Sequence, residues 1–95
     1  MLRFVLPTIV LLGACASAQP VVHGVTPGHR CDASRTQAFI GQPGTSATGA
    51  AIMRATRAAV LRWAPPGYML TMDYREDRVT VYLGADYKVT KISCG

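Results

Sequence analysis

The sequence is poor in the residues from which most active sites are built. It has only two histidines, His23 and His29, and five acidic residues. Both histidines precede Cys31, so no serine or thiol after that point has a histidine partner. Three carboxylates are bunched after Met72, which leaves no separated pair of the kind that glycosidases use, and no glycine-rich phosphate loop is present. These absences argue against an enzyme.

The sequence also lacks a run of basic residues, although its formal net charge is +5. Nucleic-acid binding would need a clustered basic patch, with aromatic residues or a recognition helix. The basic residues beyond position 30 are spread along the chain: Arg35, Arg54, Arg57, Arg62, Arg75, Arg78, Lys88 and Lys91. This spacing is typical of a solvated surface, and we expect no nucleic-acid partner.

The first residues have the pattern of an export signal. Arg3 supplies a positive start, and an apolar stretch over residues 4–12 follows, too short to span a bilayer by itself. Two cleavage sites compete. Residues 16–18 have the Ala-x-Ala form that ordinary signal peptidase cuts after, whereas residues 12–15 resemble a bacterial lipobox in which Cys15 receives a lipid. Either way we expect export, to the periplasm, to an outer-membrane anchor or into the medium.

The three cysteines leave one odd thiol in an exported protein. If Cys15 is lipidated or removed, Cys31 and Cys94 remain, and an oxidising compartment favours a disulfide between them. That bridge would join almost the two ends of a small domain whose core alone is marginal. The loop-entropy relation gives a contribution on the order of 4 kcal/mol.

These observations divide the chain into three expected parts. Residues 1–18 form the signal peptide and residues 31–95 the domain. Residues 19–30 contain proline, glycine and valine without helical or strand periodicity, and we expect a flexible linker there. His23 and His29 lie in this linker, and a metal site needs ligands that are held rigidly. We therefore expect neither a metal nor another cofactor.

The domain begins with a short helical turn in this interpretation. Asp32 opens the turn, and Phe39 and Ile40 are expected to contact the core. The sequence Gly-Gln-Pro-Gly at positions 41–44 then breaks it.

An alanine-rich helix is predicted next. Thr45 or Ser46 caps its start, and it ends near Ala58 or Ala59. Its small apolar side chains allow close approach to a sheet. Gly49 is its weak point, because glycine costs about 1 kcal/mol relative to alanine inside a helix.

The remaining segments predict strands. Residues 60–63 form a short strand, and residues 78–83 alternate polar and apolar side chains as a half-buried strand does. A turn at residues 84–86 leads into a second alternating run, 88–93, and the pair predicts a hairpin. The expected fold class is α+β, with one main helix packed on a small mixed sheet.

A long connection, residues 66–77, separates the first two strands. Loops of this length are functional or disordered, and disorder would favour glycine, serine and charged residues. This loop instead contains closely spaced apolar side chains: Tyr68, Met69, Leu70, Met72 and Tyr74. Two interpretations stay open. The side chains form a surface for a partner, or they fold back into the core as a third strand.

Two arginines follow Met72 closely, at the end of the loop. A guanidinium carries five donors in a rigid fork, so Arg75 and Arg78 are candidates to bond Thr71, Asp73 or loop carbonyls and to hold the backbone open. A loop fixed in this way loses little entropy on binding. For the neighbouring acidic residues, Glu76 and Asp77, we expect a solvated charge cluster.

At this point the chain resembles a known family. The residues that carry the resemblance are Cys31, Ile40-Gly41-Gln42, Pro66-Gly67, the run from Thr71 to Val79, and Cys94-Gly95. They are similar to the peptidase inhibitor family of bacteria and fungi that includes a fungal elastase inhibitor. The resemblance covers about residues 31–95, and it implies a fold similar to that of potato inhibitor I and eglin.

The resemblance also implies a mechanism. Residues Leu70, Thr71, Met72, Asp73 and Tyr74 would form a reactive loop that enters a serine protease as a substrate does. Met72 would fill the primary specificity pocket, and Met72-Asp73 would be the scissile bond. An apolar, unbranched side chain suits pockets of the elastase, chymotrypsin or subtilisin type, but not the carboxylate-containing pocket of trypsin.

One position departs from the pattern. Eglin-like inhibitors hold the loop with two arginines on the following strand, whereas here Arg78 matches one and Thr80 stands at the other. The resemblance therefore implies a monomeric inhibitor of serine proteases with apolar pockets, with fewer braces than usual. The alternative is a non-inhibitory envelope lipoprotein that uses the same fold for binding or structure.

Overall fold

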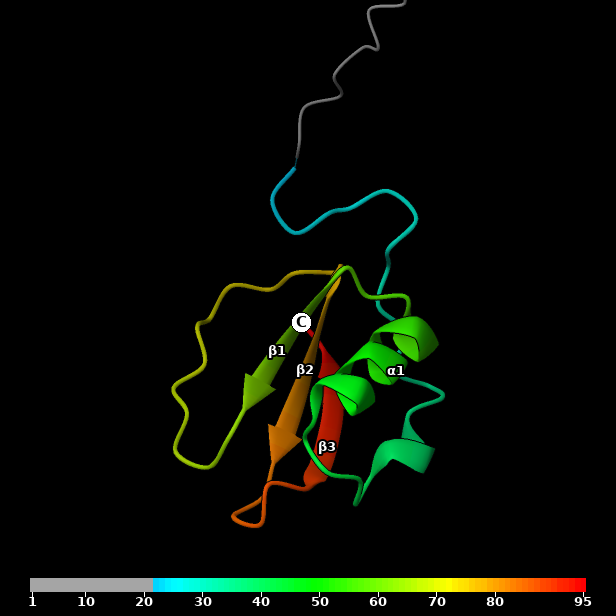
Figure 1. Ribbon diagram of the computed structural model, residues 1–95. Coiled ribbons are helices and arrows are strands. Elements are labelled where there is room, and N and C mark those ends of the chain that lie inside the picture. Colours follow the sequence, from blue (N-terminus) through cyan, green and yellow to red (C-terminus); the bar gives the residue numbers. More distant parts are fainter. Residues whose placement is uncertain (1–21) are drawn as a thin grey trace, which may run out of the picture.

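The computed structural model describes residues 22–95, and the expected export signal with Cys15 lies outside this range. Figure 1 shows one helix lying across one face of a small sheet, with a long loop at the opposite side. No helix among the described residues is long and apolar enough to cross a membrane. The fold class is α+β, as predicted.

The main helix, α1, spans Ser46–Thr56. Thr45 caps it, and its hydroxyl accepts a hydrogen bond from the Thr48 backbone N–H at 3.3 Å. The helix ends earlier than predicted because Arg57 takes the left-handed conformation, with φ of 63°. The Thr56 hydroxyl donates back to the carbonyl of Ile52 at 2.8 Å.

The segment before α1 differs from its prediction. It contains a short 3₁₀ helix, η1, at Gln37–Phe39. Asp32 does not open a helix there, since its carboxylate accepts from the Ser34 N–H at 2.9 Å and forms a local turn instead. Phe39 packs against the core as expected. The expectation for Ile40 was wrong, because it is 39 % exposed and does not pack against the core.

Three strands form the sheet, in the order β1-β2-β3. β1 spans Val60–Ala64, β2 spans Arg78–Leu83 and β3 spans Val89–Cys94. β1 and β2 are parallel, and β2 and β3 form the predicted antiparallel hairpin, so the sheet is mixed. Each strand lies within one residue of its predicted bounds.

The core lies between α1 and the sheet. Its buried side chains are Ile52, Ala58, Val79, Val81, Leu83 and Val89. β2 is the central strand, and it is buried more completely than predicted. Arg78 and Thr80, on the face opposite α1, are also buried, so this strand is covered on both sides where it begins.

Gly49 has a packing role that the helix pattern did not reveal. A Cβ at this position would lie 2.9 Å from the Trp63 ring of β1. The absence of a side chain therefore lets α1 approach the sheet at this point. Glycine is retained here for close packing although it is a poor helix former.

Candidate functional site

The connection between β1 and β2, residues 65–77, stands away from the sheet as an open loop (Figure 1). Its apolar side chains do not fold into the core as a third strand. Met72 is 100 % exposed, Met69 is 88 % exposed and Tyr74 is 70 % exposed. Leu70 is half-buried. The structure therefore agrees with an exposed loop surface and not with a third strand in the core.

Arg62 holds the loop on the side that precedes Met72. Its Nη1 donates to the hydroxyl of Thr71 at 3.0 Å, and its Nε donates to the hydroxyl of Thr80 at 3.4 Å. Arg62 reaches these groups because it faces Thr80 in the parallel register of β1 and β2. Arg62 was not among the predicted loop contacts, because only the strand register brings it beside the loop.

Arg78 holds the loop on the other side of Met72. Its Nη2 donates to the backbone carbonyl of Asp73 at 2.9 Å, and its Nε donates to the carbonyl of Gly95 at 3.1 Å. The Arg78 side chain is largely buried, so these bonds lie in a partly dehydrated setting where they are stronger than in water. This is the loop-supporting contact that the sequence indicated for Arg78.

Arg75 does not contact the residues around Met72. Its Nε and Nη2 instead donate to the two carboxylate oxygens of Asp77, at 3.1 and 3.2 Å. The expectation of a solvated cluster was wrong for Asp77, which is 0 % exposed. Hydrogen bonds from Arg75 and, to a smaller extent, from Thr26 lower the pKa of Asp77 to about 2. The hydrogen bond with Asp77 in turn raises the pKa of Arg75 above its ordinary value.

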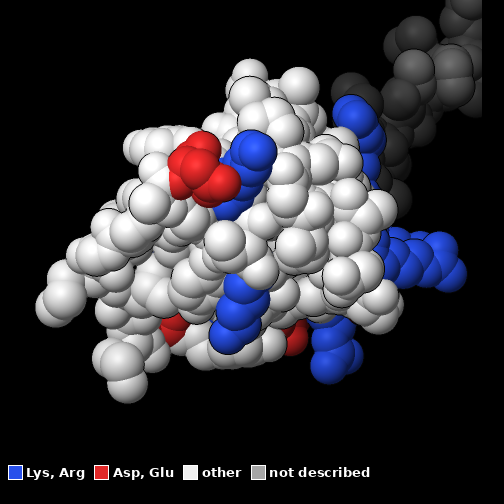
Figure 2. Space-filling model, turned by 90° about the horizontal axis from the view of Figure 1, so that it is seen from below, with Lys and Arg blue, Asp and Glu red and all other residues white. Residues whose placement is uncertain are grey.

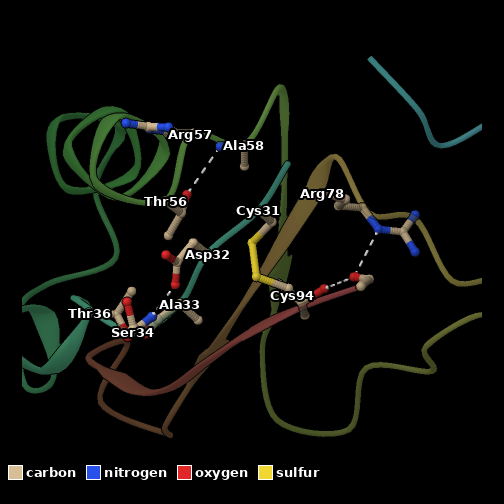
Figure 3. Close-up of a disulfide and its surroundings, with 12 residues drawn as sticks. Cys31, Asp32, Ala33, Ser34, Thr36, Thr56, Arg57, Ala58, Arg78 and Cys94 are labelled. Atoms are coloured by element: carbon tan, nitrogen blue, oxygen red, sulfur yellow. Dashed lines mark hydrogen bonds between the residues drawn. A yellow bond between two sulfur atoms is a disulfide. The ribbon is translucent and has the colours of Figure 1, made fainter. Parts of the chain in front are cut away.

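The disulfide between Cys31 and Cys94 lies beside the end of the loop (Figure 3). The backbone N–H of Cys31 donates to the carbonyl of Glu76 at 2.8 Å. Next to Cys94, the Gly95 carbonyl accepts from both Arg78 and the Thr80 hydroxyl. The bridge is remote from the loop in sequence but adjacent to it in space.

The sequence also matches a known protein family. A sequence profile described as the peptidase inhibitor I78 family matches residues 31–95. The chain belongs to this family. Members are peptidase inhibitors, so this protein is not an enzyme.

A solved structure of an elastase inhibitor is similar to the chain. The crystal structure of the elastase inhibitor AFUEI matches with a TM-score of 0.50 and 29 % sequence identity, over 62 % of this chain and 81 % of that one. No curated protein matches the chain. The family and this neighbour together support protease inhibition, and proteases as partners.

One cavity of this peptidase inhibitor, about 620 Å³, is lined by the segment around Cys31 and by Arg57 at the end of α1, and Met72 is not among its lining residues. Figure 2 shows basic and acidic side chains scattered over the face seen there, with uncharged surface between them. The loop projects from the molecule, as a segment that enters a partner's cleft does.

Asp73 is the charged residue beside Met72. Hydrogen bonding by the Thr71 hydroxyl lowers the pKa of Asp73 below its ordinary value, with further contributions from His23 and Arg78. His23 Nε2 lies 3.5 Å from an Asp73 carboxylate oxygen, and His29 Nδ1 lies 3.0 Å from the carbonyl of Arg57. No three metal-binding side chains converge within residues 22–95.

Proposed function

We propose that this protein inhibits serine endopeptidases with apolar specificity pockets, through a substrate-like reactive loop formed by Leu70, Thr71, Met72, Asp73 and Tyr74. Met72 occupies the primary pocket, and Met72-Asp73 is the scissile bond. Elastase-, chymotrypsin- and subtilisin-like enzymes are the target classes. The proposal follows from the inhibitor family, from the elastase inhibitor neighbour and from the geometry of this loop.

One observation carries the proposal: Met72 is fully exposed, while the residues on both sides of it are held from the sheet. An exposed methionine on a free loop would lose conformational entropy when it entered a pocket. Arg62 and Arg78 remove much of that cost in advance, because they fix the Thr71 side chain and the Asp73 carbonyl. The loop thus presents one apolar side chain at a defined position.

The loop backbone is available for pairing with an enzyme. In the described part of the chain, no backbone-to-backbone hydrogen bond involves residues 69–74. Among their carbonyls, that of Asp73 accepts a hydrogen bond from the Arg78 side chain. Proteases bind extended segments by adding them to the edge of a sheet, and this backbone suits that mode.

The same contacts explain why cleavage would not release the inhibitor. The protease serine attacks the Met72 carbonyl carbon, the bond to the Asp73 nitrogen breaks, and the serine proton passes through the enzyme's base to that nitrogen. An ester and a free amine result. Arg62 on one side and Arg78 on the other keep the two new ends close, so the amine attacks the ester, the peptide bond re-forms and the serine regains its proton.

The chemistry of Met72 sets the target class. A thioether side chain buries apolar area in an elastase-, chymotrypsin- or subtilisin-like pocket. In a trypsin-like pocket it would leave a buried carboxylate without a partner, which costs free energy.

Three further statements belong to this proposal. We propose that the fold is of the potato inhibitor I type, that the protein acts as a monomer, and that it works outside the cytoplasm after removal of residues 1–18 or lipidation of Cys15. The Cys31–Cys94 disulfide supports an oxidising compartment. The mass of the mature N-terminus distinguishes a lipid anchor from simple signal cleavage.

An inhibition panel tests the central proposal. The purified, oxidised protein is titrated against elastase, chymotrypsin, subtilisin and trypsin. We expect stoichiometric inhibition of the first three, and slow cleavage confined to Met72-Asp73 by mass spectrometry. Digestion throughout the chain without inhibition of any enzyme would favour the alternative, a non-inhibitory envelope lipoprotein.

A further inference from the structure

The residues before the family domain contact the loop. We define the N-terminal strap as residues 22–26, which precede the segment 31–95 that the family profile covers. The strap lies against the part of the loop that follows the Met72-Asp73 bond, residues 73–77, here called the leaving-group limb. Three contacts join the two segments, and they involve three residues of the strap.

Gly24 packs closely against the backbone of Arg75. It is buried, its φ is +80°, and an added Cβ would lie 3.1 Å from the Arg75 Cα. Its carbonyl accepts a hydrogen bond from the Asp77 backbone N–H at 3.1 Å. Both the positive φ and the narrow space favour glycine at this position.

Thr26 extends the contact into a buried polar network. Its hydroxyl donates to Asp77 Oδ2 at 2.6 Å, and the same carboxylate also accepts hydrogen bonds from Nε and Nη2 of Arg75. Asp77 is fully buried, so each of these bonds replaces water that the carboxylate has lost. Arg75 is therefore fixed to the strap through Asp77, rather than to the residues around Met72.

We infer that the N-terminal strap is a working part of the inhibitor: it clamps the leaving-group limb through Thr26, Asp77 and Arg75. The inference rests on the proposed reactive-loop mechanism. After cleavage of Met72-Asp73, the limb has a free amino end at Asp73 and stays joined to β2 at Arg78. Arg78 holds that end at one carbonyl, and the strap holds the base of the limb at Asp77. The clamp keeps the Asp73 amine near the ester and favours re-formation of the bond.

Thr26→Val tests the clamp, because it keeps the shape of the side chain and removes the hydroxyl. The measurements are the rate of cleavage at Met72-Asp73 and the equilibrium ratio of cut to intact inhibitor, in the mature oxidised protein with catalytic amounts of subtilisin. We expect both to rise about tenfold, the factor that corresponds to about one net hydrogen bond. Thr26→Ser keeps the hydroxyl and restores the wild-type ratio.

Two further variants separate the clamp from general stability. Thr90→Val removes a hydroxyl that donates to the Tyr82 carbonyl at 3.2 Å, away from the strap, and leaves the ratio unchanged. Gly24→Ala disturbs the strap by a different route, through backbone strain and contact with Arg75, and raises the ratio as Thr26→Val does. All measurements are made well below the melting temperature of each variant.

The outcomes distinguish this inference from the proposed function. If the wild-type protein inhibits and Thr26→Val and Gly24→Ala both keep its cut-to-intact ratio, the strap is only packing and the inference is overturned. If the wild-type protein inhibits no serine protease in the panel, the reactive-loop proposal falls and the inference falls with it.

Discussion

Arg62 on β1 and Thr80 on β2 occupy paired positions of the two parallel strands, and the Arg62 guanidinium bonds both the Thr80 hydroxyl and the loop hydroxyl of Thr71. The resemblance to eglin-like inhibitors implied a missing brace at position 80. The structure places a guanidinium at that site from the neighbouring strand. The loop therefore has an arginine on each side of Met72, although only Arg78 comes from β2.

Removal of the Arg62 brace should make the loop a better substrate. We expect Arg62→Ala to weaken inhibition of subtilisin or chymotrypsin by about tenfold, since one charged hydrogen bond to the loop is lost, and to speed cleavage at Met72-Asp73. Titration curves and mass spectrometry measure the two effects. Arg54→Ala is the matched control, because Arg54 is exposed on α1. Equal inhibition by both variants would show that Arg62 does not brace the loop.

Met72→Lys should redirect the inhibitor. A lysine side chain pairs with the carboxylate of a trypsin pocket and is poorly solvated in an apolar one, so we expect trypsin inhibition to appear and elastase inhibition to fall. Met69→Lys is the control, because Met69 is also exposed in the same loop. It should leave the inhibition pattern unchanged. An unchanged pattern for Met72→Lys would place the primary pocket residue elsewhere.

Much of the scaffold could be predicted from local patterns. Thr45 indicated the start of α1, and alternation indicated β2 and β3, because capping and side-chain periodicity act within a few residues. The sequence left residues 66–77 open between an exposed loop and a third strand, and the structure has the loop. The end of α1 was placed too late, since alanine continues past the left-handed Arg57 and gives no signal of a stop.

The braces of the loop could be predicted only in part. Arg78 follows the loop directly, and its role was visible from the sequence. The position of Arg62 beside the loop depends on the parallel register of β1 and β2, and the buried Asp77 accepts a hydrogen bond from Thr26, which lies 51 residues away in the chain. Such contacts are set by tertiary packing, and local sequence patterns do not encode them.

Loss of the disulfide should destabilise the whole domain. We expect Cys31→Ser with Cys94→Ser to lower the free energy of unfolding by about 4 kcal/mol, on the loop-entropy relation for a long closed loop. Urea unfolding measures the change. Reduction of the wild-type protein with dithiothreitol is the control, and it should give a similar loss. The disulfide also fixes the segment whose Cys31 backbone N–H donates to the Glu76 carbonyl at the end of the loop, so the double variant should be cut faster as well.

Gly49→Ala should not stabilise α1, although alanine is the better helix former. The propensity gain is about 1 kcal/mol, whereas extra volume in a packed site costs about 1–3 kcal/mol. The new Cβ would lie 2.9 Å from the Trp63 ring, so we expect net destabilisation. Thermal unfolding and Trp63 fluorescence test this. Ala50→Gly is the control at an exposed helix position and should cost about 1 kcal/mol through propensity alone.

The Asp77 network should make stability depend on acid pH. The folded-state pKa of Asp77 is lowered to about 2 from its ordinary 3.8, chiefly by the Arg75 and Thr26 hydrogen bonds. A lowered folded-state pKa means that the stabilisation is complete above pH 3.8 and is lost as the pH falls toward 2. Urea unfolding of the wild-type protein and of Asp77→Asn between pH 2 and 5 measures the difference.

The difference in unfolding free energy between wild type and Asp77→Asn should therefore be largest above pH 4 and shrink as the pH approaches 2. Asp86→Asn, in the turn before β3, is the control, because it leaves the Asp77 network intact and should keep the wild-type dependence. Parallel curves for wild type and Asp77→Asn would mean that the carboxylate is not stabilised by Arg75 and Thr26. In that case the strap would have no charged anchor on the loop.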